Sequence, residues 1–493
     1  MSAAGALGAA GTAGTAGTTG AAGPRAALAG LRERPGALLA VVSVAAFLAQ
    51  LDALVVTVAI PQIRVQLGAS VSAVVWTVSG YVLALAVGVI SGGRLGDQFG
   101  HRRVFLAGLG VFTLASLACG LALTPGQLIA ARVVQGLGAA LFTPQTLAML
   151  VRYYPAERRG AAFGVRGAVN GVAAVTAPVL GGLLVGAVDW RWVFWLNVPV
   201  GVLAMVLGRL AIPDAAPGDA PPGGVRLDLP GVALAAAALL CLSLGLSQGA
   251  QDSWDGRIWA LLGAGMALGA VFVRQQRGRQ ERSPLVPFAL FAVRGFSRMT
   301  ALGVLVAATI TGLVLLLSLY FQSVAGFGAL LAGLVLVPAS ACSMLLNPLA
   351  GRLAGRVEGR LLVLGGLGAT VLGMLWAAAG MRVGAHWPQF VGPMCVIGIG
   401  NAFLLTPLVT AAMHHVPRQL SGAASGVFGT ALQIGAMVGA ALVAPLVRTS
   451  PSAHSVRTAM VLLAAAACVG GAAFLAARPA PRVLTRTEPS ERG

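Results

Sequence analysis

Long apolar runs, separated by short polar or arginine-bearing segments, repeat along most of the chain. A helix that crosses a bilayer needs about 20 mostly apolar residues, and counting runs of this length gives 14 candidates. Six of them lie within residues 38–211, two within 229–274 and six within 299–477. The pattern therefore predicts an all-α integral membrane protein with 14 transmembrane helices.

The grouping of the runs predicts two six-helix bundles joined by two linking helices. An internal repeat supports it, because the glycine- and arginine-rich segment 351–360 echoes the segment 92–103 at the corresponding place in the first group. Repeated bundles with a site between them are common among secondary transporters. The predicted domains are a disordered cytoplasmic tail (1–37), an N-terminal bundle (38–211), a linker with two transmembrane helices and a basic cytoplasmic loop (212–298), a C-terminal bundle (299–477) and a second cytoplasmic tail (478–493).

Composition agrees with this assignment. Hydrophobic residues make up 57% of the 493 residues and charged residues only 10%, whereas soluble domains carry about 25% charged residues. The five cysteines lie far apart inside apolar runs, in no spacing typical of a metal site or a disulfide framework. We expect no metal and no cofactor.

The net charge of +19 comes from 33 basic residues, all of them arginine. With the N-terminus placed inside, 25 arginines fall in inside segments, 6 in outside loops and two, Arg132 and Arg166, within spans. This asymmetry predicts that both termini are cytoplasmic. It also argues against nucleic-acid binding, which would gather the basic residues on one face or tail. Near the inner end of its span, Arg166 is best explained as a side chain that reaches the interface.

The segment Gly92–Arg103 reads Gly-Gly-Arg-Leu-Gly-Asp-Gln-Phe-Gly-His-Arg-Arg. Lying between two apolar runs, it predicts a tight cytoplasmic turn whose glycines permit the chain reversal. We expect the Asp97 carboxylate to pair with arginines or with a helix N-terminus and to hold one conformation closed. The alternative is a solvated turn whose positive charges only follow the positive-inside rule. The predicted conformational gate consists of Gly93, Arg94, Asp97, Gly100, Arg102 and Arg103.

Several motifs resemble those of one family, the major facilitator superfamily, and within it the 14-helix drug:proton antiporters. Singly the motifs are weak, but their order and spacing are specific. The matching segments are Gly93–Arg103, Arg132–Ala140, Ala177–Gly182, Asp52–Pro61, Trp190–Gly201, Pro284–Pro287 and Arg418–Gly426. The chain departs from the usual pattern at Leu54, Thr57 and Ala177, and Gly355 stands in the second loop where Asp97 stands in the first.

Asp52 is the only one of 14 acidic residues that lies well inside an apolar run. An acid in this position usually faces a cavity or takes up a proton, and the resemblance implies the same role, in proton coupling. The resemblance assigns Arg132 to proton transfer as well, and an intramembrane guanidinium would hold a nearby carboxylate ionised. A structural acid and an arginine that reaches the outer interface are the alternatives.

The predicted fifth helix contains the motif Pro178, Gly181 and Gly182, in a run of small residues. Small residues allow close packing of helices, and proline removes one internal hydrogen bond. The resemblance implies a seal and pivot that favours antiport, and ordinary packing is the alternative. Polar or aromatic residues within spans are candidates for the substrate cavity: Gln50, Trp76, Tyr81, Gln145, Asn170, Tyr320, Asn401 and Gln433.

These observations predict a proton-coupled antiporter of the cytoplasmic membrane that exports lipophilic or cationic drugs and acts as a monomer. Its partners would be the small-molecule substrate, protons and the bilayer. Because the chain has no lysine, it has no phosphate-binding loop of the GxxxxGK[ST] type, so we do not expect ATP to drive transport. A dedicated exporter of one endogenous metabolite or antibiotic is the main alternative. A symporter or a membrane enzyme fits the motifs and the unclustered histidines less well.

Overall fold

The computed structural model describes residues 35–213, 228–251, 255–281, 284–448 and 452–476. Every regular element in these ranges is a helix, and 14 helices are long and apolar enough to cross a membrane. The predicted fold class and number of spans are therefore confirmed. The predicted tails lie outside the described residues, except that the first helix already begins at Pro35.

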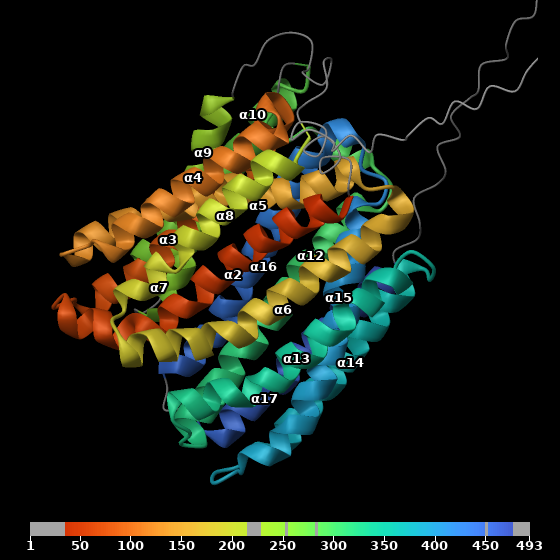
Figure 1. Cartoon of the computed structure of the whole chain (residues 1–493). Coiled ribbons are helices and arrows are strands. Elements are labelled where there is room, and N and C mark those ends of the chain that lie inside the picture. The colour runs from red at the N-terminus through yellow and green to blue at the C-terminus, as the bar shows by residue number, and fades with distance from the viewer. Residues whose placement is uncertain (1–34, 214–227, 252–254, 282–283, 449–451, 477–493) are drawn as a thin grey trace, which may run out of the picture.

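Figure 1 shows the long helices lying side by side in two groups with the linking helices beside them. The first bundle contains α2 (Pro35–Gln66), α3 (Val71–Phe99), α4 (His101–Gly120), α5 (Pro125–Tyr153), α6 (Ala156–Ala187), α7 (Arg191–Trp195) and α8 (Asn197–Ala211). The linker contains α9 (Leu229–Gln251), α10 (Gly256–Gly278) and the short α11 (Ala289–Ala292). The second bundle contains α12 (Phe296–Leu319) with a π-helical turn at Tyr320–Val324, α13 (Ala329–Leu353), α14 (Gly359–Gly380), α15 (Val391–Met413), α16 (Ser421–Arg448) and α17 (Ala453–Ala476). Short 3-10 turns at Trp387–Phe390 and Arg418–Leu420 precede α15 and α16.

The two bundles repeat the same packing. In the first bundle α2 packs on α6, and α5 packs on both α3 and α4. In the second bundle α12 packs on α16, and α15 packs on both α13 and α14. Each helix thus has its counterpart at the same position in the order of the other bundle, as an internally repeated transporter fold requires.

Glycines bring the two bundles into contact through α3 with α16 and α6 with α13. A Cβ atom on Gly164 would lie 2.5 Å from the Asn347 carbonyl oxygen and 3.1 Å from Pro348 Cα, and one on Gly171 would lie 2.8 Å from Met344 Cβ. Small residues of this kind allow helix backbones to approach closely inside a membrane. The contacts at Gly164 and at the start of α16 lie toward the side where α2 begins and α17 ends, the predicted cytoplasmic side.

The expected turn at Gly92–Arg103 is much shorter than the sequence suggested. Helix α3 continues to Phe99 and α4 begins at His101, so only Gly100 reverses the chain, with φ 91°. A positive φ of this size favours glycine. The preceding glycines pack instead: Gly93 lies against the Gly422 backbone, where a Cβ atom would clash. Charged residues lowered the hydropathy of this segment and concealed a helix that extends past the apolar run.

Gly138 of α5 provides a test of this packing, because a Cβ atom there would lie 2.6 Å from the backbone nitrogen of Phe112 in α4. We expect Gly138→Val to separate two packed helices and to lower the melting temperature of the purified protein by several degrees, as overpacked cores generally do. The matched control is Gly263→Val in α10, where nothing lies within 4 Å of the added atom. Equal melting temperatures for the two variants would contradict the proposed packing.

Candidate functional site: a buried carboxylate and guanidinium

Asp52 lies near the middle of α2, which runs from Pro35 to Gln66. Its side chain is fully buried. An ionised carboxylate in an apolar interior is costly unless it is paired and hydrogen-bonded. The carboxylate accepts three hydrogen bonds in the described conformation, two on Oδ1 and one on Oδ2.

Arg132 supplies the charge partner. The cap of α5 starts the helix about two turns before Arg132. In this cap, Thr124 Oγ1 accepts from the Gln127 backbone, and Pro125 is the first helical residue. Arg132 Nη1 donates to Asp52 Oδ2 at 2.7 Å, and Nε donates to the Thr77 carbonyl at 3.2 Å. The guanidinium is 1% exposed. The structure thus brings together the two residues predicted to couple protons, and their roles remain predictions.

Two amide side chains complete the site. Gln135 Nε2 donates to Asp52 Oδ1 at 2.9 Å, and Asn197 Nδ2 donates to the same oxygen at 2.6 Å. Gln135 also accepts from Arg132 Nη1 at 2.7 Å and donates to Ser116 Oγ at 2.6 Å. Helices α2, α4, α5 and α8 therefore meet at one buried polar network.

Sequence reasoning did not assign these amides to the site. Gln135 follows Arg132 by three residues, which places both on one face of α5, and this spacing could have identified it. Asn197 is the first residue of α8, in a motif noted only for its family resemblance. Ser116 lies in an apolar run with no signal that separates it from a packing serine.

Two aromatic rings pack against the guanidinium of Arg132. The Tyr81 ring centroid lies 4.2 Å from the guanidinium carbon and the Phe194 centroid lies 5.7 Å from it. Cation–π contacts of this length stabilise a desolvated guanidinium. Tyr81 was predicted to line the substrate cavity, and it is buried against the ion pair.

The Asp97 carboxylate joins the two bundles at the predicted cytoplasmic side. Its Oδ1 accepts from the Gly422 backbone at 2.7 Å, and its Oδ2 accepts from the Ala423 backbone at 2.7 Å. These amides belong to the first turn of α16, whose N-terminus favours negative charge. His101 Nε2 lies 3.6 Å from Asp97 Oδ1, and its Nδ1 lies 2.8 Å from Gln145 Oε1. Of the two pairings expected for Asp97, the structure shows the helix N-terminus.

The other predicted gate residues surround this contact. Arg102 donates to the Arg209 carbonyl at 2.8 Å and so ties α4 to α8. Arg103 is exposed and Arg94 is half-buried on α3. In the antiport motif, Gly181 faces Val55 and Val58 of α2, each 3.1 Å from an added Cβ atom. Pro178 lies within the unbroken α6, and a Cβ atom on Gly182 would have no neighbour within 4 Å.

The predicted cavity residues do not form one cluster. Gln145 Nε2 donates to the Gly92 carbonyl at 2.6 Å, near the Asp97 contact. Tyr320 lies in the second bundle, at the end opposite to the Asp97 contact, and its hydroxyl donates to the Arg382 carbonyl at 2.8 Å. The polar groups of both residues are therefore occupied by the protein itself. Five others are half-buried and form no side-chain hydrogen bond with a described residue: Gln50, Trp76, Asn170, Asn401 and Gln433.

At the end of the first bundle opposite to the Asp97 contact, side-chain contacts connect α2 to the segment before α8. Trp190 Nε1 donates to Gln66 Oε1 at 2.9 Å, and the Arg191 guanidinium lies 4.6 Å from the Trp190 ring centroid. Partial burial raises the pKa of Asp189, but hydrogen bonds from Arg191 and Gln66 and the charge of Arg191 outweigh it. The net effect holds the pKa of Asp189 below its ordinary value, so this loop keeps a paired carboxylate.

Two repeated six-helix bundles with a buried ion pair in one of them are typical of membrane transporters. The profile of the Major Facilitator Superfamily matches residues 42–440 and 344–492. The chain belongs to this superfamily, whose members are transporters rather than enzymes.

Named relatives include exporters. The chain is 39% identical over 421 residues to an uncharacterised transporter of the same superfamily from Mycobacterium tuberculosis, covering 85% of this chain and 72% of that protein. It is 35% identical to the tetracenomycin C resistance and export protein of Streptomyces glaucescens, covering 85% and 77%. It is 33% identical to the multidrug resistance protein Stp of Mycobacterium tuberculosis, covering 80% and 73%. The crystal structure of the human organic anion transporter MFSD10 shares the fold, with TM-score 0.67 at 13% identity over 90% of this chain and all of that chain.

We expect Asp97→Asn to weaken the contact between the bundles, because the neutral amide loses the charge that favours the α16 N-terminus. Spin labels at Phe99 and Gln419, both exposed at this side, would report the distance between α3 and α16 by pulsed electron resonance. The variant should gain a population at longer distance. The exposed Glu157→Gln is the matched control, and identical distributions for both variants would refute a closing role for Asp97.

Proposed function

We propose that this chain exports lipophilic or cationic compounds across the cytoplasmic membrane in exchange for protons. The observation that carries the proposal is the Asp52–Arg132 pair, fully buried and braced by Gln135 and Asn197. A carboxylate kept inside a membrane at this cost is generally functional. The names of the relatives, an antibiotic exporter and a multidrug resistance protein, support export.

The pair gives proton uptake a structural consequence. Asp52 accepts three hydrogen bonds in the described conformation. A proton on this group would cancel its attraction for Arg132 and leave the guanidinium as an uncompensated buried charge, which is strongly destabilising. Arg132 would then move toward another acceptor or toward water. Protonation of Asp52 therefore favours a second arrangement of α2 and α5.

The described conformation is closed on the predicted cytoplasmic side. Asp97 caps α16 there, and the glycines of α3 and α6 contact the second bundle. Alternating access requires that contacts of this kind form in one state and break in the other. We assign Gly93, Asp97 and their partner Gly422 to this gate, with both termini of the chain in the cytoplasm.

The alternative, a dedicated exporter of one antibiotic or metabolite, shares this fold and mechanism. It is favoured by the relative named for tetracenomycin C resistance and export. Half-buried polar groups such as Asn170 and Asn401 offer hydrogen bonds in either case. The two functions differ in the range of compounds transported, which a transport panel measures directly.

We expect Asp52→Asn to reduce efflux of a fluorescent lipophilic cation, such as ethidium, to the level of cells without the transporter. The amide retains the shape of the side chain but cannot carry a proton between states. Efflux by the wild-type chain should also stop when a protonophore is added. The loop variant Asp189→Asn, outside the buried network, should export normally.

Expression level and melting temperature must match between variants for the comparison to hold. Normal efflux by Asp52→Asn would show that Asp52 is structural and would overturn the coupling mechanism. If the wild-type chain exports a single antibiotic and no other compound of a broad panel, a dedicated exporter replaces the multidrug exporter as the proposed function.

A further inference from the structure

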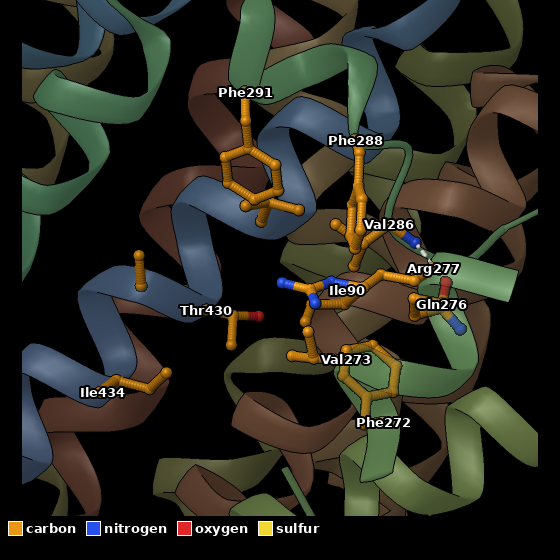
Figure 2. A pocket seen from close by; sticks show the side chains of 12 residues that line it. Ile90, Phe272, Val273, Gln276, Arg277, Val286, Phe288, Phe291, Thr430 and Ile434 are labelled. Carbon is orange, nitrogen blue, oxygen red and sulfur yellow. Dashed lines mark hydrogen bonds between the residues drawn. The ribbon is translucent and has the colours of Figure 1, made fainter. Parts of the chain in front are cut away.

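A pocket of about 480 Å³ lies between the linker and both bundles, apart from the buried ion pair. We call it the linker pocket, and its walls include Ile90 of α3, Phe272 and Val273 of α10, Phe288 of the following segment, and Val427 and Ile434 of α16. In Figure 2 the labelled apolar side chains, among them Ile90, Phe272, Val273, Phe288 and Ile434, lie around one space. Its volume is within the range of small-molecule sites. Val273 and Ile434 are exposed at its rim, so the pocket opens at the membrane-facing surface.

Three polar residues, Gln276, Arg277 and Thr430, interrupt the apolar lining. In Figure 2 the Arg277 guanidinium reaches from α10 across the pocket toward Thr430, whose hydroxyl points into the same space. Thr430 is 4% exposed, and its hydroxyl oxygen has no hydrogen-bond partner among the described residues. A buried hydroxyl without a partner is costly, and this one is placed to form a hydrogen bond with a ligand in the pocket.

The charge of Arg277 is also left available. Arg277 forms no ion pair or hydrogen bond with a described residue. Its neighbour Arg279 instead pairs with the buried Asp228 at 3.0 Å. Among the described residues, no partner neutralises the exposed Arg277 at the mouth of this apolar pocket.

The surrounding hydrogen bonds hold this end of α10 in place. Gln276 donates to Asp228 Oδ2 at 2.5 Å and accepts from the Val286 backbone at 3.1 Å. Gln280 accepts from the Phe288 backbone at 2.7 Å. These bonds fix α10 against the start of α9 and against the segment that forms one wall of the pocket. The pocket is thus built before any ligand enters.

We propose that the linker pocket binds an anionic phospholipid of the cytoplasmic leaflet, with one acyl chain in the pocket and its phosphate at Arg277. The apolar walls and the opening toward the bilayer fit a hydrocarbon chain, and the arginine lies in the last turn of α10, at the predicted cytoplasmic side. Basic pockets between transmembrane helices on this side are typical sites for anionic lipid headgroups. A bound chain touches α3 and α16 together, one from each bundle, close to the contact made by Asp97.

The test uses the purified full-length protein, stripped of lipid in detergent and titrated by native mass spectrometry. The probes are phosphatidylglycerol and phosphatidylcholine with the same acyl chains, and glycerol 3-phosphate as the charged group without chains. We expect phosphatidylglycerol to bind at least about fivefold more tightly than phosphatidylcholine. Arg277→Ala should abolish that preference, whereas Arg274→Ala, an exposed arginine of the same helix outside the pocket, should retain it.

Two further variants test the pocket itself. Ala431→Phe fills the space and should weaken binding of both lipids, and Thr430→Val preserves the shape but should weaken binding through the lost hydroxyl. Thr430→Val keeps the test decisive if the filled variant fails to fold, as judged by its melting temperature. Equal losses in Arg277→Ala and Arg274→Ala would overturn the site in favour of diffuse surface charge. Unchanged lipid binding to both Ala431→Phe and Thr430→Val would show that the lipid binds elsewhere. If glycerol 3-phosphate competes with the lipid, the ligand of this site would be a free anion instead of a phospholipid.

Discussion

The burial of the Asp52 carboxylate is the constraint on which the first bundle depends. Because the side chain is fully buried, each oxygen needs hydrogen-bond donors from the protein. The donors come from α5 and α8, and Ser116 of α4 in turn supports Gln135. Four helices are thereby held at fixed heights and rotations. The same network can change as a unit when the charge on one oxygen is neutralised, which apolar packing alone does not provide.

The contact between the bundles is built differently. It relies on glycine backbones and on hydrogen bonds at the predicted cytoplasmic side: two from backbone amides to Asp97, one between His101 and Ser421, and one from Arg159 to the His414 carbonyl. Van der Waals contact between smooth surfaces is lost and regained without rearrangement inside either bundle. In the proposed cycle, this difference separates a stable interior, which holds the ion pair, from an interface that opens. Both features are required of a rocking transporter.

Much of this organisation was predictable from the sequence. Apolar runs gave the fold class and all 14 spans, because the bilayer sets helix length. Isolation in an apolar run identified Asp52 and Arg132. Ser116 and Asn197 escaped because one hydroxyl or amide in a helix looks the same whether it packs or binds a carboxylate. The motif identified Gly93 as a gate residue but did not predict its packing, since its close approach to Gly422 depends on how distant helices meet. The turn was misjudged for a related reason: hydropathy records where the membrane ends, not where the helix ends.

Helix α3 connects the features that the structure keeps apart. Near one end its Thr77 carbonyl and Tyr81 ring contact Arg132, and near the other its Asp97 caps α16. Ile90, between them, forms part of the linker pocket. Because α3 runs unbroken from Val71 to Phe99, a displacement of Arg132 acts on the same rigid body that carries the gate residue. Coupling over distance requires a rigid element that both sites bias, and in the proposed cycle α3 is that element. Release of Arg132 by a protonated Asp52 removes a contact from one end of α3 and so changes the stability of the closed contact at the other.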